Sequence, residues 1–211
     1  MNSVLLITVV LAYGTLLLEL VVLPIPSEAS ALSLWNRPLA LRRRMLTGLA
    51  ALPALLLYVA PVAASLGELL GEAALFRAME SVPAHAGVVL VWVGSVLHLT
   101  ATLVFRQRAG DPGATPGDVG PVLVESGPFA VSRNPIALGL MLCALGWGLL
   151  LGPSQPWRTV AILAALYTVL YLDRKVRMEE QAVRGKFGAA YAQYATRVGR
   201  YLGRRRASTS R

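Results

Sequence analysis

The sequence has little charge and few of the residues from which metal sites and disulfides are built. Only 15% of its 211 residues are charged, and it contains one cysteine and two histidines. The single cysteine, Cys143, excludes an intramolecular disulfide. His85 and His98 have no cysteine or histidine nearby in the sequence, so no metal site is expected. No G-x-G-x-x-G stretch follows a predicted strand, which excludes a nucleotide-binding domain of the soluble type.

Hydrophobic residues make up 55% of the chain and gather in five apolar stretches. A helix of about 20 apolar residues crosses the hydrocarbon core of a membrane. The predicted spans are residues 4–23, 45–66, 84–105, 135–151 and 157–172. A cleaved signal peptide is the alternative for the first stretch, because Ala29-Ser30-Ala31 resembles a cleavage site, but Glu19 inside the stretch opposes it. We therefore expect an all-α, polytopic membrane protein that forms a single membrane domain over residues 1–211.

The basic residues are distributed unevenly between the predicted loops. All 20 lysines and arginines except Arg77 and Arg158 fall in the loop after the first span, in residues 106–134 or in the tail 173–211. Basic loops stay in the cytoplasm, which predicts the N-terminus outside and the C-terminus inside. A net charge of +9 can also indicate nucleic acid as a partner. The apolar spans place these charges at a membrane instead, so nucleic acid is not expected.

A turn rich in glycine and proline leads into the fourth predicted span, where Arg133, Asn134 and Pro135 follow one another. Asparagine is a favoured N-cap, since its side chain accepts a hydrogen bond from a free backbone N–H, and proline is favoured at the first helical position. Helix N-termini attract anions. The sequence therefore predicts an anion-binding site at the cytoplasmic end of this helix.

These residues carry a resemblance to a known family. Gly-Pro-Phe followed by residues 133–139 resembles the Arg-His-Pro-x-Tyr-x-Gly signature of the isoprenylcysteine carboxyl methyltransferase and phospholipid methyltransferase superfamily. Asn134 stands where that signature has histidine, and Ala137 where it has tyrosine. A second set of residues is similar to the superfamily's other signature, a Glu-Glu pair leading to Phe-Gly-x-x-Tyr-x-x-Tyr: Glu179, Glu180, Phe187, Gly188, Tyr191, Tyr194, Val198 and Arg200.

The resemblance implies an integral-membrane methyltransferase with S-adenosylmethionine as its cofactor. The acceptor would be lipophilic or delivered by the membrane: a prenylcysteine-like carboxylate, a lipid amine or a small thiol. The resemblance implies cofactor contacts from six residues: Arg133, Asn134, Pro135, Gly139, Glu179 and Glu180. Arg133 and Glu180 would have the catalytic roles. Glu179 lies about 10 Å beyond Leu172 at 1.5 Å per residue, so the tail can fold back to complete a pocket that faces the cytoplasm.

Several of these residues also have a purely structural interpretation. Glu179 and Glu180 can pair with Arg177 and Arg184 on a solvated helix face. Gly139, Cys143 and Gly146 share one face of the fourth span, and small residues let helices pack closely, here against the fifth span. The resemblance suggests instead that Gly139 leaves room for the adenosyl group.

Glu19 and His98 are ionisable groups inside predicted spans, where such groups are candidates for function. Either can line a substrate slot. The alternatives are that Glu19 pairs with Arg42, that the two pair with each other, or that His98 binds a backbone carbonyl.

Beyond Gly188 the spacing of apolar residues predicts an amphipathic helix. Its apolar stripe consists of Tyr191, Tyr194, Val198, Tyr201 and Leu202. Such a helix is expected to lie in the membrane interface, with residues 204–206, all arginine, at anionic lipid headgroups.

Two other functions stay open on the sequence. One is a membrane reductase of related architecture that uses a reduced nicotinamide cofactor, as sterol reductases do. The other is a non-catalytic membrane scaffold, which the departures at Asn134 and Ala137 would permit. The sequence chooses neither the methyl acceptor nor the oligomeric state.

Overall fold

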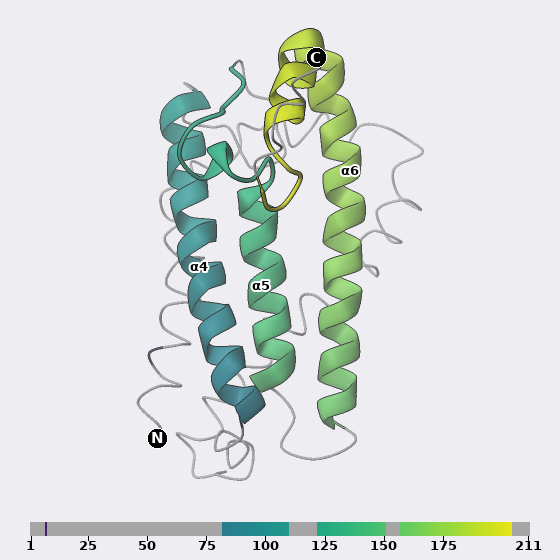
Figure 1. Cartoon of the computed structure of the whole chain (residues 1–211). Coiled ribbons are helices and arrows are strands. Elements are labelled where there is room, and N and C mark those ends of the chain that lie inside the picture. Colours follow the sequence, from purple (N-terminus) through teal and green to yellow (C-terminus); the bar gives the residue numbers. More distant parts are fainter. Residues whose placement is uncertain (1–6, 8–81, 110–121, 151–156, 204–211) are drawn as a thin grey trace, which may run out of the picture.

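The computed structural model describes residues 82–109, 122–150 and 157–203, together with Ile7 alone. Within these residues the chain is helical and has no strand. Its elements are α4 (Val82–Ala109), the short 3-10 helix η3 (Gly127–Ala130), α5 (Pro135–Leu150) and α6 (Trp157–Arg197). α5 lies between α4 and α6 and packs on both (Figure 1). The all-helical class is confirmed for this part of the chain, and the predicted spans 4–23 and 45–66 lie outside it.

One described helix, α4, is long and apolar enough to cross a membrane. Its stretch His85–Arg108 has 24 residues and a mean hydropathy of 2.1. α5 is also apolar but has 16 residues. α4 continues past the predicted end at residue 105, so Arg106 and Arg108 belong to its last turn rather than to a loop. Cations are favourable there, because the C-terminal end of a helix carries partial negative charge.

α4 and α5 approach until their main chains touch, because glycines face each other at two points. A Cβ atom on Gly94 would lie 2.6 Å from the carbonyl oxygen of Gly139, and one on Gly146 would lie 2.6 Å from that of Gly87. The order of these two pairs shows that α4 and α5 run antiparallel. The small-residue face of α5 was expected to pack against the fifth span, and this prediction is wrong: the face packs on α4. Gly148 provides the close contact with α6 instead.

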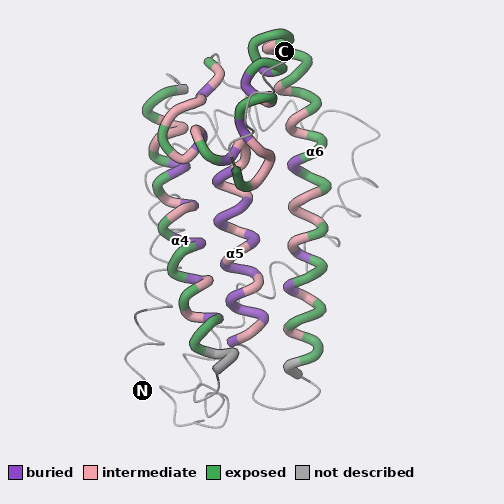
Figure 2. Tube along the Cα trace, viewed as in Figure 1, coloured by how far each residue is buried: buried purple, intermediate pink, exposed green. Residues whose placement is uncertain are grey.

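Burial follows from this order of helices. α5 is covered on both sides and holds Trp147, at 1% exposure the largest fully buried side chain among the described residues. The outer faces of α4 and α6 carry exposed apolar side chains such as Val93 and Leu163 (Figure 2). Exposed apolar surface of this kind marks a contact with lipid or with other helices.

α6 turns back on itself at Gly188. This residue has φ +50° and ψ −118°, a conformation that an L side chain rarely adopts and that glycine accepts at little cost. The nine residues after it form a helical segment, here called the return segment (189–197), which runs from the tip of α6 back toward the start of α5 (Figure 1). The second signature is therefore a helical hairpin.

The apolar side of the return segment is buried by protein. Tyr191, Tyr194 and Val198 are 3%, 2% and 6% exposed. They pack with Leu123, Val183, Phe187 and Ala195. The prediction that this stripe lies in the membrane interface is therefore wrong for these three residues. Leu202, at the end of the stripe, is exposed.

Tyr194→Phe is expected to lower the free energy of unfolding by about 1–3 kcal/mol. The Tyr194 hydroxyl donates a buried hydrogen bond of 2.6 Å to the carbonyl oxygen of Phe129, which joins the return segment to η3. Burial raises the pKa of Tyr194, so the hydroxyl keeps its proton. Thermal unfolding in detergent measures the loss, with Tyr167→Phe on the exposed face of α6 as control. Equal stability of the two variants would contradict a structural role for this bond.

Candidate functional site

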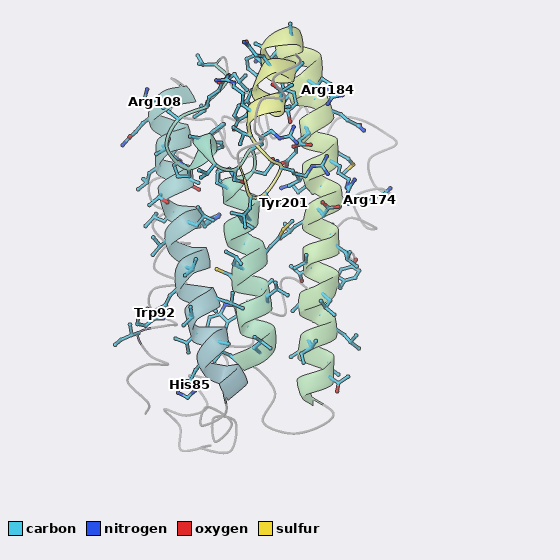
Figure 3. The ribbon with its side chains drawn as sticks, in the orientation of Figure 1. His85, Trp92, Arg108, Arg174, Arg184 and Tyr201 are labelled. Atoms are coloured by element: carbon cyan, nitrogen blue, oxygen red, sulfur yellow. The ribbon has the colours of Figure 1, made fainter. Side chains whose placement is uncertain are left out.

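A polar cluster lies where the start of α5 meets α6 and the residues that follow the return segment. The side chains of this cluster are Ser132, Arg133, Asn134, Glu180, Tyr191 and Arg200. Figure 3 shows the region near the label of Tyr201, between α5 and α6. Both sequence signatures contribute to the cluster, so it is the candidate site.

Glu180 is at the centre of the cluster. Its Oε1 accepts a hydrogen bond of 3.0 Å from Asn134 Nδ2, and its Oε2 accepts one of 2.9 Å from Arg200 Nε. Arg133 Nη2 lies 3.5 Å from Oε1, and the side chains of Arg133 and Glu180 are only 9% and 11% exposed. Charge-assisted bonds are strong where water is largely excluded. One carboxylate thus holds donors from two separate segments against α6.

One N–H donor of the Arg133 guanidinium, Nε, is not engaged by the described residues of the cluster. Its Nη1 donates to the Tyr191 hydroxyl at 3.2 Å, and the guanidinium lies 5.7 Å from the centre of the Tyr191 ring. Burial, and then the negative charge of Glu180, raise the pKa of Tyr191, so this hydroxyl stays neutral. Arg133 Nε is buried and has no hydrogen-bond partner among the described residues. Buried donors are nearly always paired, so an acceptor belongs beside this atom.

The main-chain N–H groups of the two residues that precede α5 are already used. Arg133 N donates to the carbonyl oxygen of Gly199 at 3.0 Å, and Asn134 N to that of Arg200 at 3.2 Å. The Asn134 side chain donates to Glu180 and, at 3.4 Å, to the carbonyl of Arg200. These two N–H groups are therefore not available to an anion, while the anion site expected at this helix end, with the Arg133 guanidinium beside it, stays a prediction.

The other residues implied by the resemblance lie away from the cluster or at its edge. Glu179 is turned outward and pairs with Lys175 at 3.4 Å, since neighbouring residues of a helix point in different directions. Pro135 is buried as the first residue of α5. Gly139 faces α4, where a Cβ would lie 2.8 Å from that of His98. α4 thus occupies the side of Gly139 that the resemblance reserves for an adenosyl group.

His98 is buried on the α4 side of α5, next to the first turn of that helix. Its Nδ1 lies 3.2 Å from the carbonyl oxygen of Ile136. A carbonyl only accepts, so in this contact Nδ1 carries the proton. The backbone contact considered as an alternative is thus present. A substrate role for His98 stays a prediction, as does one for Glu19, which lies outside the described residues.

Two contacts of the cluster were not assigned from the sequence. Arg200 was part of the second signature but had no role, and its side chain is the second guanidinium on Glu180. Tyr201 donates a hydrogen bond of 2.6 Å to Asp173 Oδ1. Asp173 and Glu180 lie two turns apart on one face of α6. The spacing of these two acidic residues could have predicted the contacts with Arg200 and Tyr201, but only if the turn back at Gly188 had also been predicted.

Asp173→Asn is expected to remove a pH-dependent part of the stability. Hydrogen bonds from Tyr201 and then Arg177 lower the pKa of Asp173 below its ordinary 3.8. A carboxylate with a lowered pKa stabilises the fold above its unfolded pKa, and this contribution disappears as the pH falls through the folded pKa. Thermal unfolding of the wild type and the variant should therefore differ most above the ordinary pKa of 3.8 and converge as the pH falls through the lowered pKa. Parallel curves would contradict this assignment.

Comparison with known proteins places most of these elements in one family model. The model described as phospholipid methyltransferase matches residues 83–190, just over half of the chain. The matched residues include Arg133, Asn134 and Glu180 and end before Arg200. Comparisons with curated proteins and with solved structures gave no match.

Proposed function

The chain belongs to the phospholipid methyltransferase family, and from this premise we propose that it transfers a methyl group from S-adenosylmethionine to a lipophilic acceptor delivered by the membrane. The observation that carries the proposal is the buried Nε of Arg133 beside Glu180, which has no hydrogen-bond partner in the part of the chain that the structure describes. A cation with a free donor and a carboxylate in one largely dry cluster match a ligand that carries a carboxylate and an ammonium group.

The residues of the cluster fit this cofactor as follows. Arg133 would hold its carboxylate through Nε, and Glu180 together with the Tyr191 hydroxyl would face its ammonium group. S-adenosylmethionine supplies a methyl group on a positively charged sulfur when bound. The role of the protein would be to hold the cofactor still next to the acceptor and to exclude water. Fixing two reactants in this way contributes up to about 7–11 kcal/mol.

The acceptor is the open part of the proposal. A prenylcysteine-like carboxylate needs no proton removed, whereas a lipid amine or a small thiol does. Each carboxylate in the described part of the chain is engaged by a basic side chain: Glu125 by Arg197, Asp173 by Arg177, Glu179 by Lys175 and Glu180 by Arg133 and Arg200. A base for an amine or a thiol would therefore come from His98 or Glu19, the residues predicted for substrate.

We also propose the five-span topology with the cluster facing the cytoplasm. The last turn of α4, the start of α5 and the tip of α6 lie at one end of the bundle (Figure 1), and basic residues gather there. This agrees with the rule that basic residues stay in the cytoplasm. Anionic lipid headgroups would then be partners of the arginines at 204–206, which lie outside the described residues.

Titration of the detergent-purified protein with S-adenosylmethionine and with NADPH tests the proposal. We expect binding of the first alone with a dissociation constant in the micromolar range, about −8 kcal/mol. Binding of NADPH alone would favour the membrane reductase, and binding of neither would favour the non-catalytic scaffold. Transfer of a labelled methyl group into added membrane lipids or prenylcysteine analogues then separates the acceptor classes.

A further inference from the structure

A row of polar side chains runs along the face of α4 that packs on α5. Ser95, His98 and Thr102 are 2%, 5% and 1% exposed, and Arg106 follows one turn later. Ser95 lies 3.5 Å from Cys143 Sγ, and His98 contacts the carbonyl of Ile136. The last two members differ from these. The hydroxyl of Thr102 and the Nε and Nη2 atoms of Arg106 are buried without a hydrogen-bond partner among the described residues.

The lack of a partner at Thr102 is unusual among the described threonines. Thr100 and Thr168 each donate 2.7 Å hydrogen bonds to the carbonyl four residues earlier in their helices. Thr102 does not use that acceptor. Residues four apart lie on the same face of a helix, so its hydroxyl and the Arg106 guanidinium are neighbours. Three buried donors, two of them on a cation, lie on this face without an acceptor among the described residues, and leaving such donors unpaired is costly.

These donors lie at the level of the candidate site. Gly94 pairs with Gly139, and His98 contacts Ile136, so the register of the antiparallel helices brings the next turn of α4 level with the start of α5. Phe105, next to Arg106, packs on Phe129 of η3 with the ring centres 6.1 Å apart. The position is thus on the α4 side of the signature turn, whereas Glu180 lies on its α6 side.

We propose that Thr102 and Arg106 form a subsite for an anionic oxygen group, a phosphate or a carboxylate, carried by the methyl acceptor. The planar fork of an arginine matches two oxygens of such a group, and the hydroxyl of Thr102 adds a third donor. The assignment of this group to the acceptor rests on the proposed function, while the binding of the anion does not. An acceptor held there would have its polar end at the membrane boundary, beside the signature turn.

Binding of short-chain lipids to the full-length protein in neutral detergent, without cofactor, tests the subsite. Dioctanoyl phosphatidic acid carries the phosphate, dioctanoylglycerol has the same tails without it, and inorganic phosphate is the free anion. The wild type should bind the first at least about tenfold more tightly than the second, a difference of 1.4 kcal/mol. Inorganic phosphate that competes at the same concentration as the lipid would identify a soluble anion as the source, and weaker competition would identify a headgroup.

Variants separate the subsite from a general effect of charge. Arg106→Gln should weaken binding of phosphatidic acid by about tenfold or more, Arg106→Lys less, and Thr102→Val by a few fold. Arg108→Gln is the matched control, because Arg108 is exposed and points away from the bundle (Figure 3). Equal affinities of Arg106→Gln and Arg108→Gln, or equal binding of the two lipids by the wild type, would overturn the proposal.

Affinity for S-adenosylmethionine, measured on the same preparations, keeps the two proposals apart. Arg106→Gln protein that has lost the lipid but still binds the cofactor is folded, and its defect lies in the subsite. Wild-type protein that binds phosphatidic acid through Arg106 but does not bind S-adenosylmethionine would refute the methyltransferase proposal and leave the anion subsite standing. If Arg106→Gln does not fold, the affinities of Arg106→Lys and Thr102→Val for phosphatidic acid test the subsite. If both variants bind this lipid as tightly as the wild type, the subsite is refuted.

Discussion

Replacing Glu180 by glutamine is expected to weaken the affinity for S-adenosylmethionine by roughly 10–100-fold, because hydrogen bonds to charged groups contribute about 1.5–3 kcal/mol. Glutamine keeps the shape of the side chain but removes the negative charge that two guanidinium groups share. Arg133 and Arg200 would then repel each other across the cluster, and the ammonium group of the cofactor would lose its counter-ion. Isothermal titration in detergent measures the change directly.

Glu125→Gln is the matched control for this prediction. Glu125 also pairs with an arginine, Arg197 at 2.7 Å, but these side chains are 35% and 57% exposed, far more than those of Glu180 and Arg133. Exposed pairs contribute about 0–1 kcal/mol, so cofactor affinity should change little. Thermal unfolding of Glu180→Gln shows whether the cluster is also needed for the fold. A folded Glu180→Gln protein with wild-type affinity would mean that the cluster is structural and that the cofactor binds elsewhere.

Gly94→Ala is expected to lower the free energy of unfolding by about 1–3 kcal/mol, the usual cost of overpacking, and Gly94→Leu to prevent folding. The new methyl group would lie 2.6 Å from the carbonyl oxygen of Gly139 and 2.8 Å from the amide nitrogen of Cys143. Both are main-chain atoms inside a helix, so neither can move aside alone. α4 and α5 would have to separate along their length, which would also displace His98 from Ile136.

The control for the glycine prediction is Gly185→Ala. A Cβ atom at Gly185 would meet nothing within 4 Å. Alanine is favoured over glycine in a helix by about 0.5–1 kcal/mol, so this variant should be slightly more stable than the wild type. Thermal unfolding of both proteins in the same detergent compares them. If Gly94→Ala is as stable as Gly185→Ala, the helices do not touch at this point.

The sequence was sufficient to predict the helices and the meeting of Arg133 with Glu180. Apolar stretches of the right length located α4, α5 and the first half of α6, and Asn134-Pro135 placed the start of α5 at the residue where it begins. The expectation that the tail folds back over the start of α5 came from two signatures in one order. Arg133 and Glu180 meet because a short connection joins α5 to a long α6, and both of these features can be recognised in the sequence.

The details of the site depended on contacts that a sequence does not record. Glu179 and Glu180 are adjacent and chemically alike, and only the rotation of α6 decides that Glu180 reaches the cluster. The sequence also does not show which helix covers the small-residue face of α5. In the structure this helix is α4 and not α6. The turn at Gly188 is set by one positive φ between two segments that are both good helix formers. Without that turn Arg200 has no predictable partner.

The contacts from Arg133 and Asn134 to the carbonyls of Gly199 and Arg200 have a consequence for biosynthesis. A ribosome produces Arg133 and Asn134 long before it reaches these two acceptors, so the two amides cannot make these contacts while α6 is still being synthesised. The nascent chain can complete its cluster only after residue 200 has emerged and the hairpin at Gly188 has closed. Translation that stalls within α6 would therefore yield a product that contains α4 and α5 but lacks Arg200, and with it the complete cluster around Glu180.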